Sequence, residues 1–236
     1  MLQPHFRTPP RMIVAIDGPA GAGKSSVSRL LAERLGYRFL DTGAMYRAIA
    51  LAAIRKGFTS ENSAEIADLA HRSDIRIEPT AIFLDGEDVS AEIRTVEVSA
   101  NVYLAADNPI VRAQLVELQQ AFVGTHNTVT EGRDQGTVAF PQAPCKIFLT
   151  ASPRERARRR CEELRQKGIE VTLDEILAQQ NERDERDATR PVGRLLKAAD
   201  AVELVTDGLT TDEVVNRLEE IVRAAEVRFR AARAEA

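Results

Sequence analysis

Short apolar runs alternate along this chain with longer stretches whose apolar residues recur at helical spacing. Five runs have the length and composition of strands: residues 13–16, 37–40, 128–130, 145–149 and 201–205. The run at 145–149 is apolar enough to be buried on both faces, which is typical of a strand inside a parallel sheet.

The stretches between these runs predict helices. After the first run, Val27, Leu30, Leu31 and Leu35 fall on one helical face, and Gly36 ends that helix. Further helices are predicted from Asp41 or Thr42 to Gly57, at 64–72, from Pro109 to Phe122, from Ser152 to about Lys167, from Thr172 to before Pro191, and from Thr210 onward.

Two short alternating strands, residues 75–77 and 82–84, interrupt the alternation of strand and helix. They indicate a small β-containing insertion. The rest of the pattern predicts an α/β fold, with a parallel sheet flanked by helices and a ligand site at the carboxyl ends of the strands. The polar residues after three of these strands, at 17–18, 41–42 and 133–134, should meet at that edge.

The turn after the first strand carries the most specific motif in the chain. Residues 18–25 match G-x-x-x-x-G-K-S, a loop whose backbone N–H groups and following helix bind phosphates. Lys24 is predicted to lie along the β- and γ-phosphates, and the Ser25 hydroxyl to hold Mg²⁺. The predicted ATP-binding residues are Gly18, Pro19, Ala20, Gly21, Ala22, Gly23, Lys24, Ser25 and Ser26.

Composition narrows the class of protein. The 236 residues include 44% hydrophobic and 29% charged side chains and carry a net charge of −4, which argues against a nucleic-acid partner. The two cysteines, Cys145 and Cys161, form no metal motif, so we expect reduced thiols, no zinc site and a cytoplasmic location. No apolar run is long enough for a membrane span. Residues 1–11 are expected to be a flexible extension, and the protein a monomer.

Arginines gather at the predicted strand and helix ends. Their forked guanidinium groups bind phosphoryl oxygens in pairs, so they indicate a second anionic substrate beside the nucleotide. They are Arg47, Arg112, Arg133, the cluster between Arg154 and Arg160, and Arg183, Arg186 and Arg190.

The chain resembles the bacterial-type cytidylate kinases. The resemblance rests on ordered motifs at 17–25 (DGPAGAGKS), 40–47 (LDTGAMYR), 86–90 (GEDVS) with 92–94 (EIR), 131–134 (EGRD) with 136–141 (GTVAFP), and 146–149 (KIFL). It implies transfer of the γ-phosphoryl group of ATP to CMP or dCMP with Mg²⁺. It also implies the P-loop nucleoside monophosphate kinase fold: a five-stranded parallel sheet in a core (12–60, 110–150 and 195–236), a monophosphate-binding insertion (about 61–109) and a helical lid (about 152–190).

The resemblance also implies roles for individual residues. Thr42 matches a base-contacting hydroxyl, and Arg47 and Arg133 match groups that bind the acceptor phosphate. Arg112, Asp134 and Arg190 match the residues that read cytosine, and Arg183 and Asp187 match ribose contacts. The predicted catalytic residues are Lys24, Arg133 and the lid residue Arg158. Three positions depart from the family: Thr42 in place of serine, Tyr103 in place of serine, and Gln135 in place of an aliphatic residue.

Two questions stay open at the sequence level. The first is the acceptor, because another P-loop kinase, acting on UMP, shikimate or a sugar acid, would share Lys24 and Ser25. A GTPase is not favoured, because its guanine-reading N-K-x-D motif and its D-x-x-G switch motif are absent. Asp17 and Asp41 are equally consistent with holding metal-bound water and with capping the chain around them.

Overall fold

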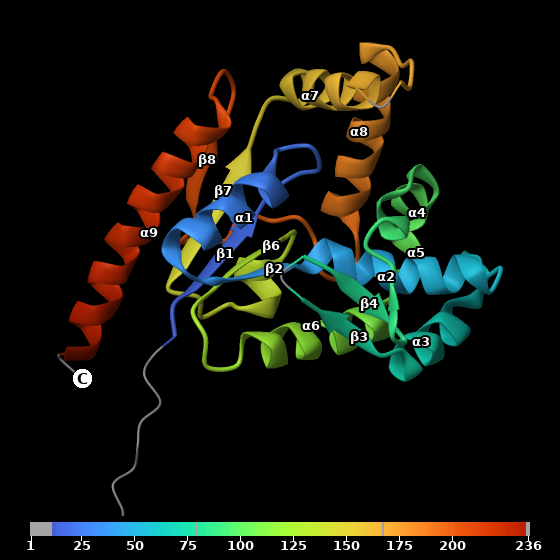
Figure 1. The fold of residues 1–236 in the computed structure, drawn as a ribbon, viewed down its shortest axis with the longest axis horizontal. Coiled ribbons are helices and arrows are strands. Elements are labelled where there is room, and N and C mark those ends of the chain that lie inside the picture. Colours follow the sequence, from blue (N-terminus) through green and yellow to red (C-terminus); the bar gives the residue numbers. More distant parts are fainter. Residues whose placement is uncertain (1–10, 79, 167, 235–236) are drawn as a thin grey trace, which may run out of the picture.

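A five-stranded parallel sheet forms the centre of the molecule (Figure 1). The computed structural model describes residues 11–78, 80–166 and 168–234. The strands are β1 (Ile13–Asp17), β2 (Arg38–Asp41), β6 (Thr128–Gly132), β7 (Cys145–Thr150) and β8 (Val202–Val205), in the order β2-β6-β1-β7-β8. All neighbouring pairs are parallel, as the sequence predicts.

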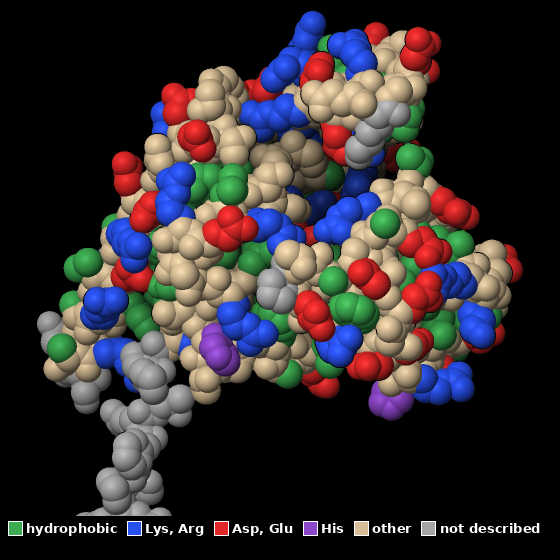
Figure 2. All heavy atoms as spheres, in the orientation of Figure 1, with side chains coloured by type: hydrophobic (Ala, Val, Ile, Leu, Met, Phe, Trp, Pro, Cys, Tyr) green, Lys and Arg blue, Asp and Glu red, His purple; other side chains and the backbone are tan. Residues whose placement is uncertain are grey.

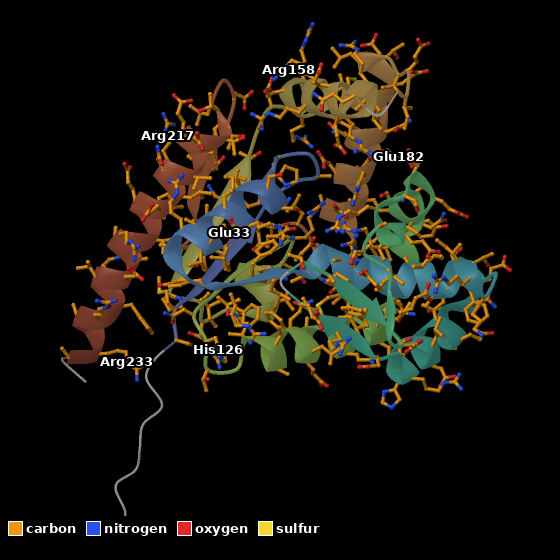
Figure 3. All side chains as sticks on the ribbon, in the orientation of Figure 1. Glu33, His126, Arg158, Glu182, Arg217 and Arg233 are labelled. Atoms are coloured by element: carbon orange, nitrogen blue, oxygen red, sulfur yellow. The ribbon has the colours of Figure 1, made fainter. Side chains whose placement is uncertain are left out.

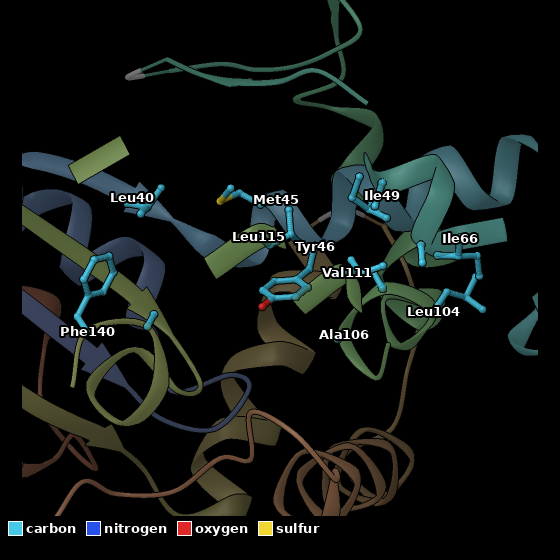
Figure 4. Close-up of a cluster of buried hydrophobic side chains, with 14 of the residues drawn as sticks. Leu40, Met45, Tyr46, Ile49, Ile66, Leu104, Ala106, Val111, Leu115 and Phe140 are labelled. Atoms are coloured by element: carbon cyan, nitrogen blue, oxygen red, sulfur yellow. The ribbon is translucent and has the colours of Figure 1, made fainter. Parts of the chain in front are cut away.

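Helices cover both faces of this sheet because successive side chains of each strand point to opposite faces. On one face, Val14 and Ile16 of β1 pack with α1 (Lys24–Leu35) and α9 (Thr211–Ala234). On the other, Ile13 and Ala15 pack with α2 (Thr42–Arg55) and α6 (Pro109–Val123). Figure 4 shows the second cluster, in which Leu40, Met45, Ile49 and Leu115 are fully buried.

The expected insertion is more helical than its sequence suggests. It holds α3 (Ser63–Arg72), a three-stranded antiparallel sheet of β3 (Ile75–Ile77), β4 (Ile82–Leu84) and β5 (Glu87–Asp88), and the short helices α4 (Val96–Asn101) and α5 (Tyr103–Ala106). The sequence analysis missed β5, α4 and α5, which are too short to show a clear period.

The expected lid is a pair of helices, α7 (Pro153–Gln166) and α8 (Leu173–Thr189), that pack on each other at the top of Figure 1. Ala157, Leu164 and Ile176 form a small apolar core between them. Thr172 and Glu175 form the predicted capping box at the start of α8. The division of the chain into core, insertion and lid stays a prediction.

Some sequence expectations need correction or lie outside the description. Leu30 does not face the core: its exposed fraction is 39%, because α1 turns that position toward solvent. Strand β6 extends two residues beyond the predicted end, so Glu131 and Gly132 belong to the sheet. Of the expected extension, residues 1–10 lie outside the described residues, as does the predicted helix end at Lys167.

No helix within the described ranges combines the length and apolar character that a membrane crossing requires. Cys145 and Cys161 are both free, and burial in the sheet raises the pKa of the Cys145 thiol to about 12.

Candidate active site

The glycine-rich loop lies between the carboxyl end of β1 and the first turn of α1. Gly18 is required by close approach, since a Cβ atom there would lie 1.9 Å from the carbonyl oxygen of Leu149 on β7. The loop curls onto Lys24, whose Nζ donates a hydrogen bond to the Pro19 carbonyl at 2.8 Å. Burial, reinforced by the charge of Arg133, lowers the pKa of Lys24. A buried ammonium that already bonds to the loop is well placed for an incoming phosphate.

Ser25 points from this loop toward the end of β6. Its Oγ donates to Glu131 Oε1 at 2.6 Å, and burial raises the pKa of the Glu131 carboxyl. No group of three or more acidic, histidine or cysteine side chains suited to a metal occurs in the described part of the chain. This donor set fits Mg²⁺, which takes one or two protein oxygens and keeps water and phosphate oxygens as its other ligands. The sequence analysis gave Glu131 no role, although its place directly after the predicted strand at 128–130 was a usable signal.

The two carboxylates left open by the sequence, Asp17 and Asp41, both accept hydrogen bonds from backbone amides. Asp17 accepts from the N–H groups of Gln135 and Gly136 at 2.8 and 2.7 Å, and Asp41 caps α2 by accepting from Ala44 N–H at 2.9 Å. Burial raises the pKa of Asp17 to about 6 despite those two bonds. These contacts support the capping interpretation.

The register of the sheet brings the predicted strand ends together. Asp17 lies opposite Gly132, and Asp41 opposite Glu131, so the ends of β1, β2 and β6 are level at one edge. The turn that follows β6 continues into a π-helical segment (Gln135–Ala139), which the sequence analysis did not expect. The predicted convergence of 17–18, 41–42 and 133–134 is therefore confirmed.

Three of the predicted arginines form a positive region beside Lys24. Arg133 Nε donates to Asp187 Oδ2 at 2.8 Å, and Arg47 pairs with Asp41 at 3.3 Å. Burial and then the charge of Arg133 lower the pKa of Arg183 to about 10, with Arg47 adding to the effect. Figure 2 shows blue side chains around a hollow that lies below α7 and beside α8. Mutually repelling guanidinium groups of this kind favour an anion between them.

A second, buried pair lies deeper in the site. Arg112 Nη2 donates to Asp134 Oδ2, Arg112 Nη1 donates to the Ala106 carbonyl at 3.1 Å, and the guanidinium lies 5.1 Å from the ring centre of Tyr46. Burial raises the pKa of Asp134, although the charge of Arg112 opposes that shift.

The remaining predicted residues surround these pairs. Arg190 bonds to Asp107 and to Asp187 at 2.6 and 2.7 Å. Burial alone would raise the pKa of Asp187, but Arg133 and Arg190 lower it below its usual value. Thr42 Oγ1 donates to the Glu131 carbonyl at 2.7 Å.

The lid arginine that reaches the loop is a different residue from the predicted one. Arg158, labelled on α7 in Figure 3, is 64% exposed and pairs with Glu155 of its own helix. Arg156 is buried instead: its Nη1 donates to the Ala20 carbonyl at 2.9 Å and its Nη2 pairs with Asp184 at 2.6 Å. Residues two apart on a helix face different directions, so only one of Arg156 and Arg158 can face the loop. Which one does depends on how α7 is rotated against the rest of the protein, and the sequence does not show that rotation. A catalytic role for Arg158 stays a prediction, and this conformation does not bring it to the site.

The structure shows the contacts of two positions that depart from the family, Gln135 and Tyr103. Gln135 is buried, accepts from Thr130 Oγ1 at 2.8 Å and donates to Gln119 Oε1 at 3.3 Å. The Arg186 guanidinium lies 5.4 Å from the ring centre of Tyr103. Gln135 thus ties the turn after β6 to α6.

A phosphate-binding loop, a buried lysine and a second, arginine-lined anion site at one sheet edge define a P-loop phosphotransferase that brings two phosphorylated substrates together. Residues 14–224 match the family model of the cytidylate kinases. The chain belongs to the cytidylate kinase family.

Two similar proteins agree with this assignment, and one solved structure shares the fold. Cytidylate kinase of Rhodopirellula baltica is 47% identical over 212 residues, covering 90% of this chain and 93% of that protein. Cytidylate kinase of Pelotomaculum thermopropionicum is 49% identical over 210 residues, covering 87% and 93%. The crystal structure of an uncharacterized protein from Eubacterium ventriosum has a TM-score of 0.50 and 13% identity, covers 91% of this chain and 99% of that chain, and supports the fold alone.

Proposed function

We propose that this protein transfers the γ-phosphoryl group of ATP to CMP or dCMP, with Mg²⁺, giving CDP or dCDP and ADP. The structural observation that carries the proposal is the position of Arg133. It lies close enough to Lys24 of the donor loop to lower the pKa of that lysine, and it is joined to Asp187 of the acceptor region. Donor and acceptor phosphates would therefore meet between the two side chains.

In this proposal the donor side consists of the loop residues 18–26, with Lys24 on the β- and γ-phosphates. Ser25 and the neighbouring Glu131 would hold Mg²⁺, directly and through water; the metal, when bound, neutralises phosphate charge. Arg156 holds the Ala20 carbonyl and so fixes the loop from the lid side.

The acceptor side would bind the monophosphate through Arg47 and Arg133, and the ribose through Arg183 and Asp187. An acceptor phosphate oxygen then attacks the γ-phosphorus in line, and the bond to the oxygen bridging the β- and γ-phosphates breaks. The chemistry needs positioning and charge neutralisation and no covalent intermediate on the protein.

Recognition of cytosine would fall to Thr42, Arg112, Asp134 and Arg190. An ionised Asp134 can accept from the 4-amino group of cytosine, whereas uracil has a carbonyl at that place and would be repelled. Arg112 supplies donors for the ring acceptors and holds Asp134 in place by their buried pair.

The experiment is ATP consumption by the purified protein with Mg²⁺ and, in turn, CMP, dCMP, UMP, AMP, GMP and shikimate. We expect turnover with CMP and dCMP alone. Turnover with UMP in place of CMP would overturn the base-reading roles of Arg112, Asp134 and Arg190, and turnover with shikimate in place of CMP would overturn the nucleotide acceptor.

Two further expectations, on oligomeric state and location in the cell, complete the proposal. The protein is proposed to be a monomer, which sedimentation equilibrium would test. It is proposed to act in the cytoplasm, which fits the free thiols of Cys145 and Cys161.

A further inference from the structure

Asp107 follows α5 in the insertion and belongs to none of the predicted sites. Its carboxylate, with a side-chain exposed fraction of 34%, accepts a hydrogen bond from Arg190 Nε at 2.6 Å. Arg190 itself is 5% exposed and directly follows α8. A charged contact across 83 positions of sequence therefore joins the insertion to the end of the lid.

This contact extends to the acceptor-phosphate region through alternating charges. Arg190 Nη2 donates to Asp187 Oδ1 at 2.7 Å, and Asp187 Oδ2 accepts from Arg133 Nε at 2.8 Å. The order is Asp107, Arg190, Asp187, Arg133. Nη1 of Arg190 makes no hydrogen bond with the part of the chain that the structure describes, so it is the nitrogen left for a ligand.

A second contact lies beside the first. The Arg186 guanidinium lies over the Tyr103 ring, at 5.4 Å from its centre. Tyr103 and Asp107 are four residues apart, and so are Arg186 and Arg190, so each pair lies on one side of its helix or just beyond its end. The two contacts fix the end of α8 against α5 in both position and rotation.

We propose that Asp107 is a positioning residue for the acceptor nucleotide: it orients Arg190 so that the free edge of the guanidinium meets the bound nucleotide. An arginine side chain has large rotamer freedom, and its planar fork is useful only when its orientation is set in advance. Asp187 alone fixes one nitrogen, and Asp107 fixes a second and so removes rotation about the fork. This inference rests on the proposed function.

The test compares Asp107→Ala and Asp107→Asn with the wild-type enzyme in steady-state kinetics and in CMP titration calorimetry without ATP. We expect Asp107→Ala to raise KM and Kd for CMP about tenfold, because a charge-assisted hydrogen bond that orders the binding group is lost. Asp107→Asn keeps an acceptor oxygen, so its KM and Kd for CMP should lie between those of the wild type and Asp107→Ala. The kcat value should stay within about twofold and KM for ATP should not change, since Arg190 touches neither the donor loop nor Lys24.

The matched control is Asp68→Ala, which removes another aspartate–arginine pair of the insertion, with Arg72 on the outer side of α3. It should leave all constants unchanged. A double-mutant cycle with Arg190→Met separates positioning from a general effect on the insertion: in that background Asp107→Ala should have no further effect on CMP binding.

Each outcome decides between the two proposals. An unchanged KM in Asp107→Ala, or an undiminished effect in the Arg190→Met background, overturns the positioning role while normal CMP turnover by the wild type keeps the proposed function. Failure of the wild type to bind or phosphorylate CMP overturns the proposed function, and this inference with it.

Discussion

Arg133 is the residue at which the two halves of the site meet. It follows β6, the strand paired with β1, and its guanidinium is held by Asp187 from the lid helix. Strands β1 and β6 and helix α8 thus together position this side chain. Its charge lowers the pKa of Lys24 on the donor side of the site.

Arg133→Met should lower kcat with CMP on the order of 10³-fold, because transferred phosphoryl charge loses its arginine partner. The fold should persist, since Asp187 keeps its bond to Arg190. Steady-state kinetics and thermal unfolding would measure both effects. Arg165→Met, on the exposed side of α7, is the control and should have wild-type activity; an unchanged rate in Arg133→Met would remove it from the transfer site.

Asp134→Asn should lower the ratio of kcat/KM for CMP over UMP about 10- to 100-fold. The amide can donate to the uracil carbonyl that a carboxylate repels. Asparagine is the better test than Asp134→Ala because its amide oxygen can still accept the hydrogen bond from Arg112, whereas alanine would leave that buried Nη2 donor without its side-chain acceptor. Competition kinetics with both monophosphates gives the ratio, and equal discrimination in the variant would refute the base-reading role.

At the scale of elements, the carboxyl end of β1 contacts both the phosphate-binding loop and the turn after β6. Asp17 ends β1, precedes the phosphate-binding loop, and accepts both backbone N–H groups at the start of the π-helical segment after β6. The Asp17 carboxylate therefore attaches the turn that carries Arg133 and Asp134 to the end of β1, next to the donor loop.

The pKa of Asp17 gives this attachment a measurable pH dependence. Folding raises that pKa from 3.8 to about 6, so the folded protein binds the proton more tightly, and the contribution of Asp17 to stability grows as pH falls from 7 toward 4. The difference in unfolding free energy between wild type and Asp17→Asn should therefore be about 1 kcal/mol larger at pH 5 than at pH 7.

Urea unfolding of both proteins at the two pH values measures this difference. Asp200→Asn is the control: a hydrogen bond from Lys146 lowers the pKa of Asp200, so its carboxyl is ionised at both pH values and the difference between wild type and this variant should not change between them. A difference for Asp17→Asn that does not change with pH would show that its carboxyl is not perturbed by burial.

At the scale of the whole molecule, the sheet separates two apolar cores, of which one adjoins the acceptor residues and the other does not. The core under α2 and α6 adjoins the acceptor residues, whereas the core under α1 and α9 lies on the opposite face and contains Leu218, which is fully buried. Stability and acceptor recognition should therefore be separable by mutation.

Leu218→Ala should lower the free energy of unfolding by about 2–5 kcal/mol, the cost of a cavity in a core that cannot collapse, and leave KM for CMP unchanged. Leu196→Ala, at an exposed position, should change neither quantity. Urea unfolding with parallel kinetics tests the pair, and a change in KM at full folding would show that the two faces are coupled.

By itself the sequence determined what depends on local order. The period of apolar residues predicted the five strands and the long helices, and residues 18–25 predicted the phosphate-binding loop. Capping residues predicted where α2, α7, α8 and α9 begin, and Pro109 predicted the start of α6. Each of these features is decided by residues within one or two turns of one another.

Only the tertiary structure decided which distant residues meet. The contact of Asp17 with Gln135 and Gly136, the choice of Arg156 over Arg158 at the loop, and the pairing of Asp107 with Arg190 each join segments far apart in the sequence or depend on helix rotation. The short elements β5, α4 and α5 are likewise held by packing against α2 and β4. No local pattern encodes such contacts, because they form only after strands and helices are placed against each other.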